Sequence, residues 1–359
     1  MSSNHKRILF IIKQRYAYGQ ITKAYGLYNS CDFVARKLNE LHIETEVVEV
    51  VDNNDIDREV ARFKPTDVYI EALWVVPEKF KILSALHPKV EWHIRLHSKS
   101  PFIATESIAI EWLTEYMKLR EQGIKINLSA NSEEFYKNLK HMFGGKFVSY
   151  SPNLYYPNPD LTPSIEIPNY RTNAKEFHIG IFGALRPLKN HLQQVLWAIQ
   201  YGSVIDRPIV VHINVSPHET QNGKNGSMMG ILSNIRNVFN TSNINARLVE
   251  HPWYSHVDFL NIVGQMDMGL QVSYSETFNI VAADFIYMNI PIVGSDEIKF
   301  INPMSRVDSN SSDDAMKVMN ISRKFAKLGL NKLNKLLLSR SNDKALDQWR
   351  TLVCSERHH

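Results

Sequence analysis

Short apolar runs alternate with helical patterns along most of the chain. The run Arg7–Ile12 (RILFII) is almost continuously apolar, which is typical of a strand buried on both faces of a parallel sheet. Asn29–Leu41 follows with Phe33, Val34 and Leu38 at helical spacing. This opening predicts a strand, a connection and a covering helix.

The same alternation continues through both halves of the chain. It predicts further strands at Glu46–Val51, Asp67–Leu73, Lys89–Leu96, Ile124–Ala130, Lys146–Ser151, His178–Phe182, Pro208–Asn214, Ala246–Glu250, Met268–Val272 and Ile290–Val293. It predicts helices at Asp55–Phe63, Glu78–Leu86, Glu106–Arg120, Ser132–Met142, Asn190–Ile199, Met228–Phe239, Val257–Gly264 and Phe278–Met288, and helical patterns dominate from Asp313 onward. Repeated β-α-β units indicate mainly parallel sheets with helices on both faces.

A proline-rich break separates the two halves. Five of the fifteen prolines fall between Pro152 and Pro168, where each fixes its own φ and donates no ladder hydrogen bond. We therefore expect an α/β protein of two Rossmann-like, doubly wound domains facing a cleft, over residues 1–155 and 177–340. A linker over 156–176 joins them, and a final helical segment covers 341–359, with Ala345–Cys354 as its helix.

Composition narrows the class of protein. The 359 residues suit two domains, and 44% apolar with 22% charged residues fits a globular chain. Cys31 and Cys354 are the only cysteines, which excludes a disulfide framework and a Cys-based zinc site and favours a reducing, cytoplasmic location. No secretory signal and no apolar run of about 20 residues is present.

Charge is unevenly distributed although the net value is only +4. Seven basic residues and no acidic one lie between Ala315 and Asn342. Such a stretch can contact an anionic partner, or it can simply keep a helix solvated.

The segment Ser275–Asp284 (SETFNIVAAD) lies between two expected strands and carries the most informative polar residues. We expect Thr277 to Ile280 to form a first helical turn, where unpaired N–H groups attract anions. Asp284 comes eight residues after Glu276, about two turns along the same flank. Alone, the pair reads equally well as a helix N-terminal acid plus a surface acid.

Together with its flank, ETFNIVAAD…IPIVGS, this segment resembles the E-x7-E motif of the retaining GT-B glycosyltransferases. Two positions depart from the family pattern: Asn279 replaces a glycine, and Asp284 replaces the second glutamate. The resemblance implies that Glu276 positions hydroxyls of the donor sugar and Asp284 binds ribose. It also places Thr277, Phe278, Asn279 and Ile280 against the donor nucleotide.

A second matching segment runs from Ile179 to Asn190. Gly183 permits a close backbone approach, and Arg186 and Lys189 precede a helix N-terminus that attracts anions. In the family such cations bind the donor diphosphate, although the arginine usually follows the glycine, where this chain has Ala184. The alternative is two solvated cations in a loop.

Weaker matches add three site residues. Arg95-Leu96-His97-Ser98 ends a strand where family members carry a histidine near the donor sugar, so His97 is a catalytic candidate. Gly19, in the Tyr-rich loop Lys13–Tyr28, corresponds to a family glycine beside the donor phosphates, and His251 lies where the base is bound. Pro152-Asn153-Leu154 resembles a family turn, and an HxxxH metal site at His93 and His97 lacks a third ligand.

The resemblance implies a metal-independent hexosyltransferase that needs no cofactor and moves a sugar, with retention, from a nucleotide-diphosphate sugar to a hydroxyl acceptor. UDP-sugars are favoured over GDP- or ADP-sugars as donors, Glu276, His97, Lys189 and Arg186 are the catalytic candidates, and the last helix should return to the first domain. The acceptor stays open: a nucleic acid, as for phage enzymes that modify DNA bases, a polysaccharide or a lipid. A nucleotide-sugar epimerase of similar fold, or a non-catalytic binder, is the alternative from another class.

Overall fold

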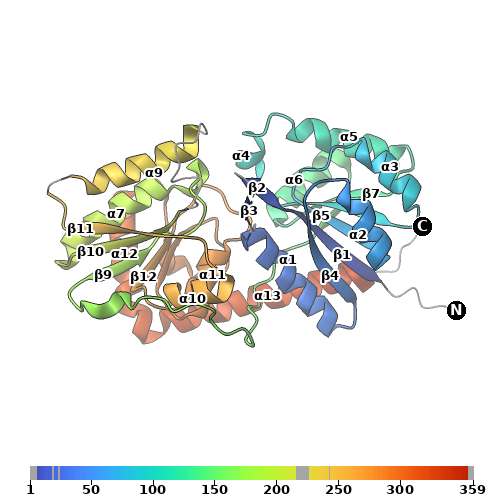
Figure 1. Cartoon of the computed structure of the whole chain (residues 1–359). Coiled ribbons are helices and arrows are strands. Elements are labelled where there is room, and N and C mark those ends of the chain that lie inside the picture. Colours follow the sequence, from blue (N-terminus) through green and yellow to red (C-terminus); the bar gives the residue numbers. More distant parts are fainter. Residues whose placement is uncertain (1–5, 18–19, 23–24, 216–225, 242, 355–359) are drawn as a thin grey trace. The chain divides into compact units, whose positions relative to one another are not determined.

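The computed structural model describes residues 6–17, 20–22, 25–215, 226–241 and 243–354. The chain divides into two compact units, one made of Met1–Pro157 with Asn342–His359 and the other of Asn158–Ser341 (Figure 1). Most of the proline-rich segment, expected as a linker, is thus grouped with the second unit. Within the described ranges no helix is long and apolar enough to cross a membrane.

The first unit is built on a six-stranded parallel sheet in the order β4-β1-β5-β6-β7-β8. Its strands are β1 (Arg7–Lys13), β4 (Glu44–Val50), β5 (Asp67–Glu71), β6 (Glu91–Leu96), β7 (Ile126–Ala130) and β8 (Val148–Tyr150). Its helices are α1 (Tyr25–Glu40), α2 (Asp55–Phe63), α3 (Lys79–Leu86), α4 (Ser100–Ile103), α5 (Ala109–Glu121) and α6 (Glu133–Phe143), with the end of α13 (Asn331–Cys354). A short hairpin adds β2 (Arg15–Ala17) and β3 (Gln20–Thr22).

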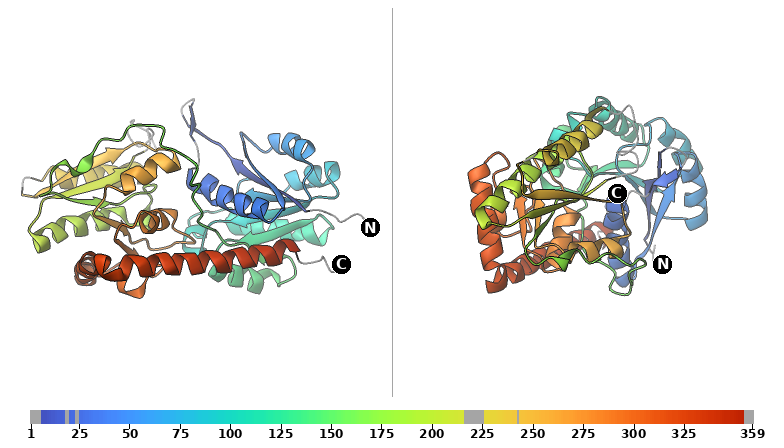
Figure 2. Two further views of the ribbon diagram at one scale, coloured as in Figure 1. Left: turned by 90° about the horizontal axis from the view of Figure 1, so that it is seen from below. Right: turned by 60° about the vertical axis from the view of Figure 1, so that its left-hand side comes forward.

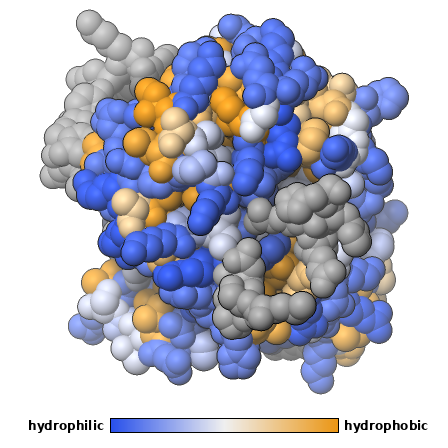
Figure 3. Space-filling view, turned by 90° about the vertical axis from the view of Figure 1, so that its right-hand side faces the viewer, coloured by the Kyte–Doolittle hydropathy of each residue, from blue (hydrophilic) through white to orange (hydrophobic). Residues whose placement is uncertain are grey.

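The apolar pattern explains why these segments are strands and helices. Residues 8–12 of β1 and all five residues of β5 are buried, as expected for strands covered on both faces. Helix α2 buries Ile56, Val60 and Phe63, which share one helical face. The face shown in Figure 3 is mainly hydrophilic, with small patches of hydrophobic side chains between the polar ones.

The second unit repeats the architecture with the order β11-β10-β9-β12-β13-β14, again parallel throughout. Its strands are β9 (Phe177–Gly180), β10 (Ile209–Asn214), β11 (Ala246–His251), β12 (Met268–Gln271), β13 (Ile292–Ser295) and β14 (Arg306–Val307). Its helices are α7 (His191–Ile205), α9 (Gly226–Phe239), α10 (His256–Val263), α11 (Ile280–Tyr287), α12 (Ser312–Phe325) and the start of α13, with the short turns η1 (Tyr170–Thr172), η2 (Pro187–Lys189), η3 (Pro303–Ser305) and η4 (Ala326–Leu330).

Each sheet reverses its strand order once. In the first unit the chain leaves β1 for β4 on one side and β5 on the other; in the second it builds β10 and β11 on one side of β9 and β12 on the other. In open parallel sheets the loops at the carboxyl ends diverge at such a reversal and leave a ligand-binding crevice. In the second unit, the loops after β9 and β12 are therefore the expected place for a ligand.

Three sequence expectations differ from the structure. The stretch Lys13–Tyr28, expected as a loop, contains the β2–β3 hairpin and the first turn of α1. Helix α11 begins at Ile280, so Thr277 and Phe278 are not part of its first turn. The last helix, expected at Ala345–Cys354, begins at Asn331.

The C-terminal half of α13 packs within the first unit (Figure 2). The Asn342 side chain donates to the Tyr155 carbonyl and accepts from the Tyr155 amide at 2.9 and 3.0 Å. The Trp349 indole N–H donates to the Pro152 carbonyl at 2.7 Å. These bonds hold the turn that follows β8.

Candidate functional site

The loops after β9 and β12 are tied together in the second unit. The Asn190 amide donates to the Val272 carbonyl at 3.2 Å, and the Tyr274 N–H donates to the Leu188 carbonyl at 2.9 Å. Asn190 has a left-handed φ of 57°, which Asn tolerates better than most residues, and it is the residue that precedes α7. These two bonds hold the two loops in one arrangement at the strand reversal of the second sheet.

Glu276 is the central acid of this site. It is 6% exposed, and its Oε1 accepts from Lys189 Nζ at 2.5 Å, Ser273 Oγ at 2.8 Å and Asn279 Nδ2 at 2.9 Å. Within the described part of the chain no residue hydrogen-bonds Oε2, so that oxygen can accept a bond from a ligand. A buried carboxylate with one oxygen fixed and one available is suited to orient hydroxyl groups.

Lys189 pairs with Glu276 while remaining reachable, because its side chain is 29% exposed and that of Glu276 only 5%. Gly183, at the other end of the same loop, has a φ of 117°, and a Cβ there would meet open space. Its N–H donates to the Asn214 side chain at 3.1 Å, at the carboxyl end of β10. Arg186 stands at the start of η2 and is partly buried. The loop that carries Arg186 and Lys189 therefore ends at the N-terminus of α7, where unpaired N–H groups attract anions.

His191, in the first turn of α7, lies against this loop. Burial and the nearby Lys189 charge lower its pKa to about 3, against the opposing effect of a hydrogen bond with the Gly183 backbone. The imidazole is therefore neutral at physiological pH and adds no charge beside Lys189.

Glu276 to Asn279 form a structured turn ahead of α11 rather than its first turn. Asn279 is the N-cap: its side-chain oxygen accepts from the Ala282 N–H at 2.8 Å, and its amide bonds Glu276 and Gln271. The Glu276 N–H donates to Glu297 at 3.1 Å. The asparagine that replaces the family glycine thus caps the helix and holds Glu276.

Asp284 is 1% exposed, and its Oδ1 lies 2.7 Å from Nε2 of His256, the first residue of α10. Because Glu276 precedes the helix, the two acids do not share a helical flank as expected. Asp284 faces α10 through His256 instead.

His251 belongs to a row of three buried histidines on adjacent strands. His178 Nδ1 lies 2.9 Å from His212 Nε2, and His212 Nδ1 lies 2.8 Å from His251 Nε2. Burial lowers all three pKa values, to about 2 for His212, where the other two histidines add to the effect, and to about 4 for His251. His251 is 1% exposed, so its ring packs inside the sheet layer.

The first unit has its own buried polar cluster at the ends of β5 and β6. Arg95 is fully buried and donates to Glu71 at 3.1 Å, to the Ser151 and Pro152 carbonyls, and to Asn153 Oδ1 at 2.6 Å. Burial alone would raise the pKa of Glu71, but the Arg95 and His97 neighbours outweigh it and lower that pKa. The cluster includes the Pro152-Asn153 turn singled out in the sequence.

His97 bridges this cluster and the end of β7. Its Nε2 contacts Glu71 Oε2, and its Nδ1 lies 3.1 Å from the Asn131 amide nitrogen. Burial lowers the pKa of His97 despite the Glu71 charge, which favours a neutral ring that donates to Glu71 and accepts from Asn131.

His93 does not join His97 in a metal site: it contacts Asp67 at 3.2 Å and stacks on Tyr69. No group of three or more His, Cys, Asp or Glu residues arranged to hold a metal ion occurs in the described ranges.

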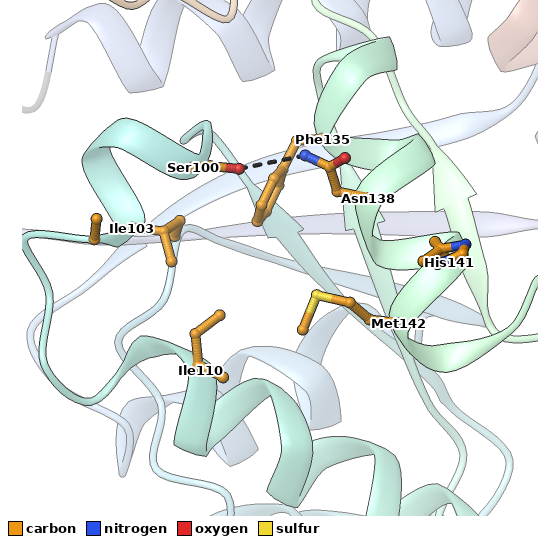
Figure 4. A pocket seen from close by; sticks show the side chains of 8 residues that line it. Ser100, Ile103, Ile110, Phe135, Asn138, His141 and Met142 are labelled. Carbon is orange, nitrogen blue, oxygen red and sulfur yellow. Dashed lines mark hydrogen bonds between the residues drawn. The ribbon is translucent and has the colours of Figure 1, made fainter.

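A cavity of about 460 Å³ lies in the first unit. Its walls come from α4, α5 and α6, which follow His97 and Asn131 in the chain (Figure 4). Isoleucine side chains face Phe135 and Met142 across the cavity, while Asn138 donates to Ser100 at the rim. It is lined by Ser100, Ile103, Ala104, Ile110, Phe135, Asn138, His141 and Met142.

The structure thus brings together Lys189, Glu276 and Asn279, while Gly183 and Arg186 lie on the loop that carries Lys189. Gly19 lies outside the described residues. Sequence reasoning missed Ser273, Gln271 and His256 in the second unit and Glu71 in the first. The available signal was a polar residue at the end of an apolar strand, as in DVYIE and MGLQ.

No protein-family model and no curated protein sequence matches the chain. Solved structures do. A sucrose-phosphate synthase from Thermosynechococcus elongatus matches with a TM-score of 0.63 at 12% identity, over 97% of this chain and 98% of the other. A UDP-forming α,α-trehalose-phosphate synthase from Burkholderia xenovorans matches at 0.62 and 10%, over 98% and 100%. An E. coli structure described as trehalose-6-phosphate bound with UDP-2-fluoro glucose matches at 0.65 and 10%, over 97% and 99%. Each similarity spans both Rossmann-like units, and the chain has the GT-B fold.

Proposed function

We propose that the chain is a glycosyltransferase whose second unit binds a nucleotide-diphosphate sugar. One observation carries the proposal: Lys189 and Glu276, from the loops after β9 and β12, form an ion pair at the strand reversal of the second sheet. Lys189 can bind phosphate and Glu276 can bind sugar hydroxyls, and both lie where open parallel sheets bind ligands.

Lys189 and Arg186 act on the diphosphate. When the donor binds, Lys189 Nζ exchanges its bond to Glu276 for the phosphates, and the α7 N-terminus adds unpaired N–H groups. As the glycosidic bond breaks, negative charge grows on the departing diphosphate, and fixed cations stabilise it more in the transition state than before. This leaving-group stabilisation by residues of the chain requires no metal.

Glu276 uses its available Oε2 to accept from hydroxyls of the transferred sugar. Asp284 accepts hydrogen bonds from ribose hydroxyls in exchange for its bond to His256. Transfer proceeds with retention at the anomeric carbon, as the motif resemblance implies.

A UDP-sugar is the proposed donor. Support comes from the neighbours described as UDP-forming and as bound with UDP-2-fluoro glucose. The cavity of the first unit is the proposed acceptor site, because two of the helices that line it, α4 and α6, follow the strands β6 and β7, which end at Leu96 and Ala130.

The test compares Lys189→Met and Glu276→Gln with the wild type, using UDP-, GDP- and ADP-sugars. We expect a UDP-sugar to raise the melting temperature of the wild type, because it binds the native state alone, and Lys189→Met to remove most of that rise. Turnover should fall by about 100-fold or more in both variants, as for the loss of one preorganised electrostatic contact. Lys175→Met, at an exposed lysine of the same unit, is the matched control.

Two outcomes would contradict the proposal. Near-normal turnover in both variants would show that Lys189 and Glu276 do not take part in sugar transfer. An epimerised sugar formed from a UDP-sugar with no acceptor present would show that the protein is an epimerase and not a transferase.

A further inference from the structure

The bend between α12 and α13 in the second unit exposes an unusual combination of side chains. Residues 323–340 present five exposed cations and four exposed large apolar side chains, here called the basic–apolar bend. The cations are Arg323, Lys324, Lys332, Lys335 and Arg340; the apolar residues are Phe325 (44% exposed), Leu328 (77%), Leu333 (39%) and Leu336 (46%). Figure 2 shows the chain changing direction there, through η4.

The inward face of the same segment is already occupied. Leu330 and Leu338 are 7% and 6% exposed. Asn331 donates to the Asn289 carbonyl at 2.8 Å, and Asn334 accepts from the Asn302 N–H at 2.8 Å. The segment therefore already packs one face against the second unit, and the exposed leucines lie on its other face.

The conformation of the bend places Leu328 outward. Gly329 has a φ of 119° inside the π-helical turn η4, which breaks the helix next to Leu328. Leu328 is the most exposed of the large hydrophobic residues in the described ranges. Isolated exposed apolar residues need no explanation, but four of them within twelve residues concentrate apolar surface on one short segment.

The cations of the bend lack the ion pairs seen on other helices. In α2 Arg58 and Arg62 pair with Asp55 and Glu59, and in α5 Lys118 pairs with Glu115. In the bend, Lys324, Lys332, Lys335 and Arg340 form no ion pair within the part of the chain that the structure describes. A helix kept soluble by mixed charges would show such pairs.

We propose that the basic–apolar bend docks the protein on an anionic lipid surface. Cations on both sides of outward leucines fit a headgroup layer, where lysine and arginine meet negative charge and leucine enters the acyl boundary. A nucleic acid would use the same cations, but it offers no apolar phase for Leu328, Leu333 and Leu336. Docking of this kind needs no membrane-spanning helix and is independent of the proposed donor chemistry.

The test is co-sedimentation of the full chain with vesicles of phosphatidylcholine alone and with vesicles containing equimolar phosphatidylcholine and phosphatidylglycerol. We expect partition into the anionic vesicles to exceed that into the neutral ones by roughly tenfold or more, and to fall as salt is added. Leu328→Ser should reduce binding by roughly tenfold, because it removes the burial of one leucine in the acyl boundary. The double variant Lys332→Gln/Lys335→Gln should reduce binding by roughly tenfold as well, because it removes the attraction of two cations to the anionic headgroups.

Matched controls separate docking from folding and from donor binding. Leu196→Ser removes an exposed leucine of α7 that is 42% exposed, and Lys175→Gln removes an exposed cation outside the bend; both should bind vesicles like the wild type. All variants should keep the wild-type melting temperature and its response to a UDP-sugar. Equal binding to both vesicle types, or equal binding by wild type and bend variants, would overturn the proposal. Single-stranded DNA that displaces the protein from vesicles and binds Leu328→Ser as tightly as wild type would also overturn it, in favour of a nucleic-acid surface.

Discussion

Asn279 shows how one side chain can serve the helix and the site together. Its oxygen caps α11 through the Ala282 N–H, while its amide donates to Glu276 and Gln271. Asn279 is 3% exposed, so any of these groups left without a partner is also shielded from water. Replacing Asn279 should therefore lower the free energy of unfolding in two ways: α11 loses its cap, and buried partners of the Asn279 amide lose a hydrogen bond.

We expect Asn279→Ala to lower the free energy of unfolding by about 2–4 kcal/mol, the sum of a cap and the hydrogen bonds to buried acceptors. Ser311→Ala is the matched control, because Ser311 caps α12 through the Asp314 N–H at 3.2 Å and has no link to the site. It should cost only about 1 kcal/mol. Urea denaturation of both variants measures the difference; equal losses would mean that the Asn279 amide contributes nothing.

At the residue scale, the sequence indicated which residues belong to the site better than it indicated their contacts. Glu276 and Lys189 were expected close to one ligand because both follow strands, and the structure pairs them directly. Thr277 was wrongly placed in the helix, because the cap that decides the start is two residues later and depends on a side-chain bond. The bond from Gln271 to the Phe182 carbonyl joins residues 89 apart, a distance that no local pattern reports.

The strands and longer helices were predictable because burial imposes a period on each of them. Residues 8–12 of β1 read as continuously apolar because both faces are covered, and α2 was predicted with its observed bounds. The three-residue strands β2 and β3 were missed: RYA and QIT are too short for an alternation to stand out.

The histidine row across β9, β10 and β11 gives an element-scale prediction about acid stability. In the unfolded chain these histidines titrate near 6.5, whereas burial lowers the native pKa of His251 to about 4 and of His212 to about 2. Below pH 6.5 the unfolded state therefore binds more protons than the native state, and the free energy of unfolding falls as pH falls. Each buried histidine adds up to about 1.4 kcal/mol per pH unit.

Groups around the row do not reverse this sign. Glu176 and Asp267 lie near His178 and favour its charged form, while Arg247 and Arg171 oppose it, and the net pKa of His178 is still lowered. Tyr170 contacts His212 and His251 edge-on, and Tyr254 contacts His251 edge-on. We expect His212→Gln to make the decline between pH 6.5 and pH 5 shallower, measured by urea denaturation across that range. His141→Gln, at an exposed histidine of α6, should leave the slope unchanged; an unchanged slope in His212→Gln would show that the row titrates normally.

At the scale of the whole molecule, each unit has its own apolar core around its own parallel sheet. The chain nevertheless returns to the first unit after completing the second, through α13. Trp349 is the anchor of that return: it is fully buried, donates to the Pro152 carbonyl, and packs against Phe10 and Tyr69 with ring centroids 5.9 and 5.4 Å away. Trp349 thus joins α13 to the side chains of β1 and β5.

Trp349→Ala should consequently destabilise the first unit selectively. Removing a buried tryptophan costs about 3–5 kcal/mol through lost apolar contact and the cavity left behind. Here the Pro152 carbonyl also loses one of its two donors and keeps only Arg95. Calorimetry with and without a UDP-sugar can assign the transitions, because donor binding should raise the melting of the second unit alone. We expect Trp349→Ala to lower the transition that the donor does not shift, while Lys344→Ala, exposed on the same helix, leaves both in place. If Trp349→Ala lowered both transitions equally, the two units would have to unfold as one cooperative body, and the separate cores would not define separate stabilities.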